Sequence, residues 1–328
     1  MLIIDTLAFL QSDFFGIEPA GGDWELIKNC GITAINQTLD LPSWENWVQS
    51  VLKFTYYFDK YPEVVTKVLG SKDIERAQRE GLVGVIFGSQ SADYLGRDLA
   101  LLGQAYNHGL RIQLMVYNTR NYWGDGCNER TNSGLSYSGI QAIQRMNELG
   151  ILIDCAHTGE QTALETMKYS KTPVIISHCN MRALHENPRN ISDHLARTCA
   201  EQGGVIGITW LSMFVGPKED CNVDTLLRHI RHCINVAGIE HVCIGSDALI
   251  LGFRRRYSDE KSFFEHNKQY IELYNAGYLR YPCWVEPFDG PNAHKLLIEA
   301  LESGGFSSAE IERIMGLNFF RVFKEVVG

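Results

Sequence analysis

Short runs of apolar and β-branched residues alternate along the chain with longer amphipathic stretches. The short runs predict strands and the longer stretches predict helices, because their hydrophobic periods match a pleated strand and a 3.6-residue helical turn. Eight runs predict strands: Leu2–Leu7, Ile32–Gln37, Leu82–Phe87, Arg111–Tyr117, Ile151–Cys155, Pro173–Ser177, Val205–Thr209 and His241–Gly245.

The stretches between these runs, and two after the last, predict helices. They are Ser43–Leu69, Leu95–Asn107, Ser138–Leu149, Glu160–Tyr169, Ser192–Glu201, Val223–Ala237, Asn292–Ser303 and Ser307–Val322. Glycine follows several of them just before the next strand, as in "NHGL" and "ELGI", which is typical of a helix C-cap. No Pro/Gly/Ser-rich linker divides the chain, so residues 1–328 are expected to form one domain. The pattern favours a (β/α)8 TIM barrel over a doubly wound sheet, although periodicity alone does not distinguish them.

Two successive predicted strands end beside a histidine. His157 follows the fifth strand and His178 follows the sixth, while Asp247 lies at the end of the eighth in "CIGSD". The carboxyl ends of barrel strands share one rim, so these side chains are expected to lie close together. A single histidine after a strand is usually a hydrogen-bonded rim residue, but two with an aspartate favour a metal site, and Zn²⁺ accepts both ligand types. Asp247 is alternatively a proton-transfer group. The other histidines, including His229 and His294, are assigned to solvation or capping.

Composition excludes several classes of function. The formal net charge is −9 and no long Lys/Arg run is present, which argues against nucleic acid as a partner. Nine cysteines without CxxC pairs favour a reducing, cytoplasmic location. The N-terminal segment lacks a basic region before its apolar run, so it predicts a strand instead of a signal peptide, and no apolar run is long enough to span a membrane.

Several motifs in the same order resemble the membrane dipeptidase (renal dipeptidase) family, peptidase family M19. They are "GILIDCAHTGEQT", "KTPVIISHCNMRALHENPRNISDHLARTCAEQGGVIGI", "HVCIGSD", "IERIMGLNFFRVF", "LALLGQAYNHGLRIQLMVYNTRN" and "GLSYSGIQAIQRMNELG". The resemblance covers most of the chain from about Gly84 onward. It implies an amidohydrolase-like metal-dependent hydrolase barrel, usually with two zinc ions, that cleaves dipeptides and forms a homodimer.

The resemblance assigns roles to individual positions. His157 and His178 match the two histidines that hold the second zinc, and Asp247 matches the aspartate that handles the water and leaving-group protons. Arg189, in "PRN", matches the arginine that binds the substrate carboxylate, for which a planar guanidinium is suited. Asn190 beside it is expected to contact substrate.

The first metal site of that family is altered in this chain. The first strand, "IIDTLAF", has Leu7 and Phe9 where the resemblance expects His and Asp, and neither side chain ligates a metal. Gln90 stands at the position of a bridging glutamate, and Tyr117 at that of a substrate-contacting histidine. We therefore expect one zinc ion per chain, held by His157 and His178 together with Asp247 or Gln90.

The predicted activity is hydrolysis of the amide bond in a dipeptide or a related small carboxylate-bearing amide. Tyr117 is expected to donate to the carbonyl or oxyanion, Asn118 to bind substrate, and Leu7 and Phe9 to form an apolar pocket floor. Two alternatives stay open. One is another metal-dependent enzyme in a specialised small-molecule pathway, and the other is a catalytically inactive, ligand-binding barrel.

Overall fold

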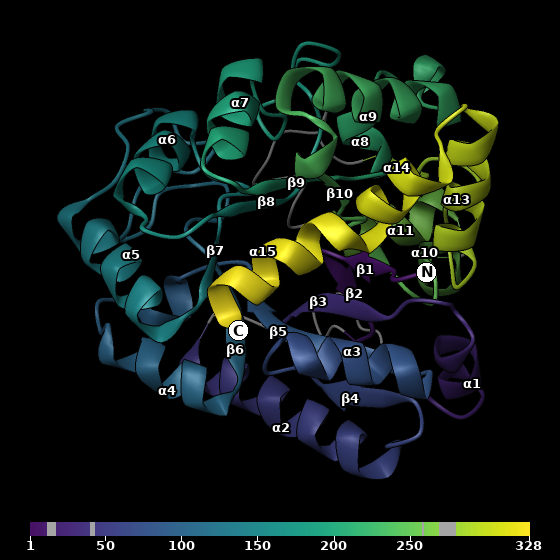
Figure 1. The fold of residues 1–328 in the computed structure, drawn as a ribbon, viewed down its shortest axis with the longest axis horizontal. Coiled ribbons are helices and arrows are strands. Elements are labelled where there is room, and N and C mark those ends of the chain that lie inside the picture. Colours follow the sequence, from purple (N-terminus) through teal and green to yellow (C-terminus); the bar gives the residue numbers. More distant parts are fainter. Residues whose placement is uncertain (12–17, 40–42, 258, 269–279) are drawn as a thin grey trace.

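Eight parallel strands form a barrel in the order in which they occur along the chain (Figure 1). The computed structural model describes residues 1–11, 18–39, 43–257, 259–268 and 280–328. The barrel strands are β1 Ile4–Asp5, β3 Ala34–Thr38, β5 Val83–Ser89, β6 Leu110–Leu114, β7 Leu152–Asp154, β8 Ile175–Cys179, β9 Val205–Ile208 and β10 Val242–Ile244. Each overlaps one predicted strand, so the predicted fold class is confirmed.

Short additional strands lie beside the barrel strands. Strand β4 Val65–Lys67 pairs with β5, and β2 Ala8–Phe9 pairs with β11 Ala248–Leu249. The ring closes between its first and last strands, because the backbone N–H of Thr6 donates to the carbonyl oxygen of Ile244 at 2.9 Å. Just beyond, the N–H of Asp247 donates to the carbonyl oxygen of Leu7 at 2.8 Å.

Helices surround the barrel, as the crossover connections of parallel strands require. The α-helices of the described residues are α1 Asp23–Lys28, α2 Trp44–Lys60, α3 Ser71–Glu80, α4 Ala100–His108, α5 Tyr137–Leu149, α6 Glu160–Tyr169, α7 Asp193–Glu201, α8 Ser212–Val215, α9 Val223–Ala237, α10 Phe253–Arg256, α11 Glu260–His266, α13 Ala293–Ser303, α14 Ser308–Glu312 and α15 Asn318–Val327. Short 3-10 turns lie at Asp93–Leu95, Lys218–Asp220 and Ile239–His241, and a π turn at Arg313–Leu317 separates α14 from α15.

The predicted helix Ser43–Leu69 is too long. Helix α2 ends at Lys60, and the residues after it form β4. Pro62 explains the difference, since a proline disfavours helical geometry at the residue before it, and Tyr61 has φ −130° and ψ 52°. Two other predicted boundaries are also wrong, because α4 begins at Ala100 instead of Leu95 and the last predicted helix contains the π turn.

The C-terminal helix closes one end of the barrel. In Figure 1, α15 lies across the barrel, drawn in yellow. Phe319, Val322, Phe323 and Val326 of α15 form one buried cluster with a side chain from each barrel strand: Ile4, Ala34, Ile86, Ile112, Leu152, Ile175, Val205 and Cys243. Because this end is filled by apolar side chains, polar chemistry is left to the opposite rim, where the strands end.

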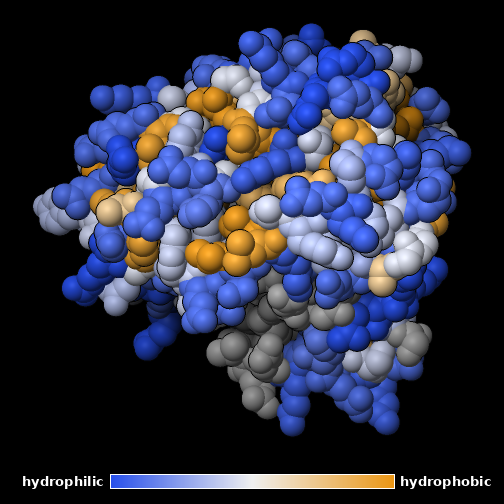
Figure 2. Space-filling model, turned by 90° about the horizontal axis from the view of Figure 1, so that it is seen from below, coloured by the Kyte–Doolittle hydropathy of each residue, from blue (hydrophilic) through white to orange (hydrophobic). Residues whose placement is uncertain are grey.

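The molecular surface carries no membrane-spanning element in its described part. No described helix combines the length and the apolar character that a bilayer crossing requires. On the face shown in Figure 2, apolar residues reach the surface in groups separated by hydrophilic ones.

A buried contact between an aspartate and a histidine lies at the seam where the ring closes. One carboxylate oxygen of Asp5 accepts from the N–H groups of Leu7 and Ser246, at 3.0 and 2.9 Å. The other lies 2.7 Å from Nε2 of His294 on α13. Asp5 is fully buried and His294 nearly so, which shows that the assignment of His294 to solvation or capping was wrong. One side chain thus joins the first strand, the eighth strand and α13.

We expect Asp5→Ala to lower the free energy of unfolding by about 3–5 kcal/mol, because it leaves His294 and two backbone N–H groups buried without their acceptor. Asp5→Asn, which keeps an acceptor for those N–H groups, is expected to lower the free energy of unfolding by less. Urea denaturation measures both. Glu148→Ala is the matched control, since it breaks the exposed Arg145–Glu148 pair and should cost at most about 1 kcal/mol. Equal losses at the two sites would contradict the role of Asp5.

His229 of α9 is also buried, so its assignment to solvation or capping was wrong as well. Its Nδ1 accepts from the N–H of Met181 at 3.0 Å, and its Nε2 lies 2.8 Å from the carbonyl oxygen of Val215. The first contact requires a neutral ring with its hydrogen on Nε2, which then donates to Val215. Burial lowers the pKa of His229 to about 4.

This lowered pKa predicts a loss of stability in acid. The unfolded chain takes up the proton near pH 6.5 and the folded protein only near pH 4, so stability is complete above pH 6.5 and falls between these values. The shift corresponds to about 3 kcal/mol. His229→Gln retains one acceptor and one donor without titrating, so its unfolding free energy should fall less steeply over this range. Parallel curves for the two proteins would contradict the prediction.

Candidate functional site

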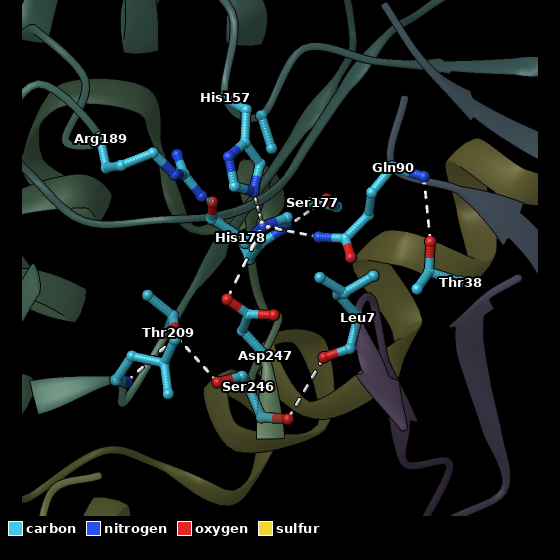
Figure 3. A network of polar contacts seen from close by, with 12 residues as sticks. Leu7, Thr38, Gln90, His157, Ser177, His178, Arg189, Thr209, Ser246 and Asp247 are labelled. Carbon is cyan, nitrogen blue, oxygen red and sulfur yellow. Dashed lines mark hydrogen bonds and ion pairs between the residues drawn. The ribbon is translucent and has the colours of Figure 1, made fainter. Parts of the chain in front are cut away.

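Two imidazoles face each other at the carboxyl ends of the strands. His157 lies three residues beyond β7, past the strand as predicted. His178 was predicted to lie past its strand too, but it lies within β8. Their Nε2 atoms are 2.8 Å apart. Figure 3 shows His157, Gln90 and Asp247 arranged around His178, and Oδ2 of Asp247 lies 3.9 Å from its Nε2. The structure therefore brings together the three residues that the strand ends suggested.

The Nδ1 atom of each imidazole contacts an oxygen on the side away from the other ring. His157 Nδ1 lies 2.7 Å from Oδ1 of Asn118, which accepts. His178 Nδ1 lies 2.7 Å from the Ser177 hydroxyl, which itself donates to the carboxylate of Asp154. Both contacts place the ring proton on Nδ1, so both Nε2 atoms direct a lone pair toward the same point.

Burial and charge keep both rings neutral. Burial lowers the pKa of His157 and His178 well below the ordinary value, and the nearby Arg189 guanidinium lowers both further. Burial also raises the pKa of Asp247 to about 7, with Arg189 opposing the shift and Asp5 adding to it. Two neutral rings whose lone pairs meet at 2.8 Å repel each other unless a cation lies between them.

Backbone strain is concentrated at these residues. Among the described non-glycine residues, those with a positive φ are Asn118 at 61°, His157 at 61° and Asp247 at 56°. A non-glycine residue in this region costs of order 1 kcal/mol or more and persists only where the surrounding contacts enforce it. All three belong to the site, which indicates that the fold holds their side chains in place at a cost in stability.

Arg189 is a buried cation that lies beside the imidazoles. The residue is 4% exposed, its Nη2 donates to the carbonyl oxygen of His178 at 3.1 Å, and its guanidinium lies 5.2 Å from the ring centre of Phe214. Within the described residues, no carboxylate lies within ion-pair distance of it, and its Nε has no hydrogen-bond partner. A buried guanidinium in this state is suited to an anionic ligand.

The two predicted asparagines have different surroundings. Asn118 contacts His157 directly and therefore orients an imidazole, a role that the sequence did not indicate. Asn190 donates from Nδ2 to the carbonyl oxygens of His185 and Phe214, both at 2.9 Å, so its amide hydrogens hold the surrounding loops together. Substrate contact by either residue stays a prediction.

The four remaining site candidates lie around the same rim. Leu7 and Phe9 are buried, and the Leu7 side chain lies between Gln90 and Asp247 in Figure 3. Gln90 places Nε2 at 3.3 Å from Nε2 of His178. Tyr117 stacks on His157, with ring centres 4.1 Å apart. None of the four adds a charged ligand, and the loss of the first metal site stays a prediction.

Sequence reasoning missed Ser177, which links Asp154 to His178. Neighbouring residues of a regular strand point to opposite faces, so strand alternation argues against a contact between the Ser177 and His178 side chains. The pairing of β8 with β9 is irregular between Ile176 and Cys179, however, and there the Ser177 hydroxyl reaches the ring beside it. The adjacency "SH" was the available signal.

Comparison with known proteins identifies the family. The family model described as "Membrane dipeptidase (Peptidase family M19)" matches residues 32–259. The chain belongs to the membrane dipeptidase family.

Curated proteins and solved structures are also similar to this member of the membrane dipeptidase family. An uncharacterised Klebsiella pneumoniae protein encoded in the pqqA 5' region is 33% identical over 192 residues, which cover 55% of this chain and 70% of that protein. The uncharacterised dipeptidase C965.12 of Schizosaccharomyces pombe is 28% identical over 76% of this chain and only 54% of its own length. A solved amidohydrolase from Pseudomonas aeruginosa is 26% identical, with a TM-score of 0.85 over 100% of this chain and 97% of that one.

A solved dipeptidase described as a metallo peptidase of family M19 shares this fold, with a TM-score of 0.81 at 16% identity. The donor atoms at the present site fit a metal ion in part. The converging lone pairs of His157 and His178 suit a borderline cation. Two nitrogens on one tetrahedral zinc lie about 3.3 Å apart, so the present 2.8 Å requires a small opening. The described residues contain no group of three His, Cys, Asp or Glu side chains already spaced for a metal. Asp247 is the nearest carboxylate to His178 and the third ligand within reach.

Proposed function

We propose that this protein is a metallohydrolase that cleaves the amide bond of a dipeptide or a related small amide with a free carboxylate, using one zinc ion per chain. The observation that carries the proposal is the pair of neutral imidazoles that face each other beside buried Arg189, which has no carboxylate partner among the described residues. His157 and His178 would hold the ion together with Asp247 or Gln90. A zinc ion there would polarise the scissile carbonyl and activate water.

Each remaining step is assigned to a residue of the chain. Arg189 binds the substrate carboxylate and thereby positions the amide beside the imidazoles. Asp247 accepts a proton from the attacking water and returns it to the leaving amine. Tyr117 donates its phenolic hydrogen to the developing oxyanion. Leu7 and Phe9 make the wall beside Asp247 apolar and exclude water there.

Family membership and named dipeptidases support the reaction class, while the single zinc ion rests on this chain's residues. Leu7 and Phe9 at the first strand supply no ligand, and Gln90 is neutral where two cations would need an anionic bridge. The same residues favour an inactive, ligand-binding barrel as the second candidate. The homodimer and the cytoplasmic location stay predictions, as does the small-molecule nature of the partner.

Metal content tests the proposal first. Elemental mass spectrometry of protein purified without chelator should find about one zinc per chain, and His157→Ala should lose it because one of two imidazole ligands is gone. Two ions per chain would contradict the mononuclear site. No ion, even after zinc is supplied, would contradict the hydrolase and leave the binding barrel.

A second test concerns Arg189. For a dipeptide that the protein hydrolyses, Arg189→Met should lower kcat/KM by about 10- to 100-fold, since a hydrogen bond to a charged group contributes about 1.5–3 kcal/mol. The same dipeptide with its carboxylate amidated is the matched control. The kcat/KM of wild type should fall by a similar factor when the dipeptide is replaced by its amidated form. The kcat/KM of Arg189→Met should fall little further on that replacement. Independent losses from the two changes would contradict a direct contact between Arg189 and the carboxylate.

A further inference from the structure

The two facing imidazoles differ in what supports them from behind. His157 Nδ1 contacts the neutral amide of Asn118. His178 Nδ1 contacts the Ser177 hydroxyl, which leads on to the carboxylate of Asp154. The two proposed metal ligands are therefore backed by one neutral group and one acidic group.

We propose that Asp154, acting through the Ser177 hydroxyl, is a positioning residue that holds the proton of His178 on Nδ1 and makes its Nε2 the stronger of the two metal ligands. The inference rests on the proposed function insofar as it concerns a metal ion. The position of the proton itself does not depend on that function.

The contacts of Asp154 fix the direction of this hydrogen-bond chain. Its Oδ1 accepts from the backbone N–H groups of Ala156 and Ser177, both at 2.9 Å, and its Oδ2 accepts from the Ser177 hydroxyl. Every contact of the carboxylate is thus made by a group that is able to donate. Because the serine hydrogen is used on Asp154, the serine oxygen has only lone pairs to offer His178, and the ring must carry its hydrogen on Nδ1.

Burial makes this hydrogen-bond chain rigid. Asp154, Ser177 and His178 are all buried, on the adjacent strands β7 and β8. Water is therefore excluded as a competing partner. Burial raises the pKa of Asp154, while the hydrogen bonds from Ser177 and Ala156 and the Arg189 charge oppose this and favour the carboxylate. A carboxylate acceptor behind a ligating imidazole raises the basicity of its metal-binding nitrogen. Asn118 also accepts a hydrogen bond from Nδ1 of His157, but its amide carries no negative charge.

Asp154→Asn gives the sharpest contrast, because it should reverse the direction of the hydrogen bonds from His178 through Ser177 to residue 154. The asparagine Oδ1 is required by the two backbone N–H groups, so the amide nitrogen is left facing the Ser177 hydroxyl. The hydroxyl then accepts from the amide and donates to His178 Nδ1. His178 would carry its hydrogen on Nε2, where it blocks a metal.

The experiment combines zinc affinity with the position of the ring proton. Zinc alone is the probe, with affinity measured by competition against a chromophoric chelator. Imidazole ¹⁵N shifts of the metal-free protein report the tautomer. Asp154→Asn and Ser177→Ala should weaken zinc binding about 10- to 100-fold. Ser177→Thr, which keeps the hydroxyl, should restore most of it, and Asn118→Asp should strengthen binding because it gives His157 an anionic partner too.

The controls separate this inference from a structural role and from the proposed function. Asn118→Gly suits the positive φ at that position, so it removes the amide without adding backbone strain. It should weaken zinc binding less than Asp154→Asn does. The melting temperature of the metal-free protein shows whether Asp154→Asn and Ser177→Ala are folded. If the folded variants bind zinc as tightly as wild type does, the inference is overturned. If wild type binds no zinc, the proposed function fails, and the ¹⁵N shifts decide the inference alone: His178 protonated on Nε2 in wild type would overturn it.

Discussion

The buried carboxylate of Asp5 holds together the seam on which the rest of the barrel depends. It accepts from Leu7 and Ser246, at the ends of the first and eighth strands, and it contacts His294 on α13. The residue after Ser246 is Asp247, whose strained backbone projects its carboxylate toward His178. The buried contacts of Asp5, far in sequence from His157 and His178, thus set where the site's carboxylate lies.

The chemistry of the site is decided by atoms that lie behind it. Asn118 and Ser177 direct the lone pairs of two neutral imidazoles at each other, an arrangement that is unfavourable without a cation. Positive φ at Asn118, His157 and Asp247 adds backbone strain to this electrostatic cost. The protein maintains both because the α15 cluster and the seam at Asp5 stabilise the barrel around them. The α15 cluster at one end of the barrel and the seam at Asp5 thus stabilise the fold, while the reactive side chains lie at the opposite end.

Much of the fold was readable from the sequence because local patterns determine parallel strands and crossover helices. The limits of that reading are local too. Pro62 ended α2 where hydrophobic periodicity alone extended the helix to Leu69. His294 and His229 resembled surface histidines, since nothing near them in sequence shows that Asp5 or Met181 is their partner. The role of Ser177 depended on an irregularity in β8 that strand alternation does not predict.

The sequence by itself determined the order of the eight strands, the family and the candidates His157, His178, Asp247 and Arg189, because these follow from hydrophobic period, strand ends and local motifs. It also showed that Leu7, Phe9 and Gln90 offer no charged ligand. Only the tertiary structure decided which atoms of these residues meet. Hydrogen-bond direction, burial and backbone strain depend on contacts between residues as far apart as Asp5 and His294, and such contacts exist only once the barrel has closed.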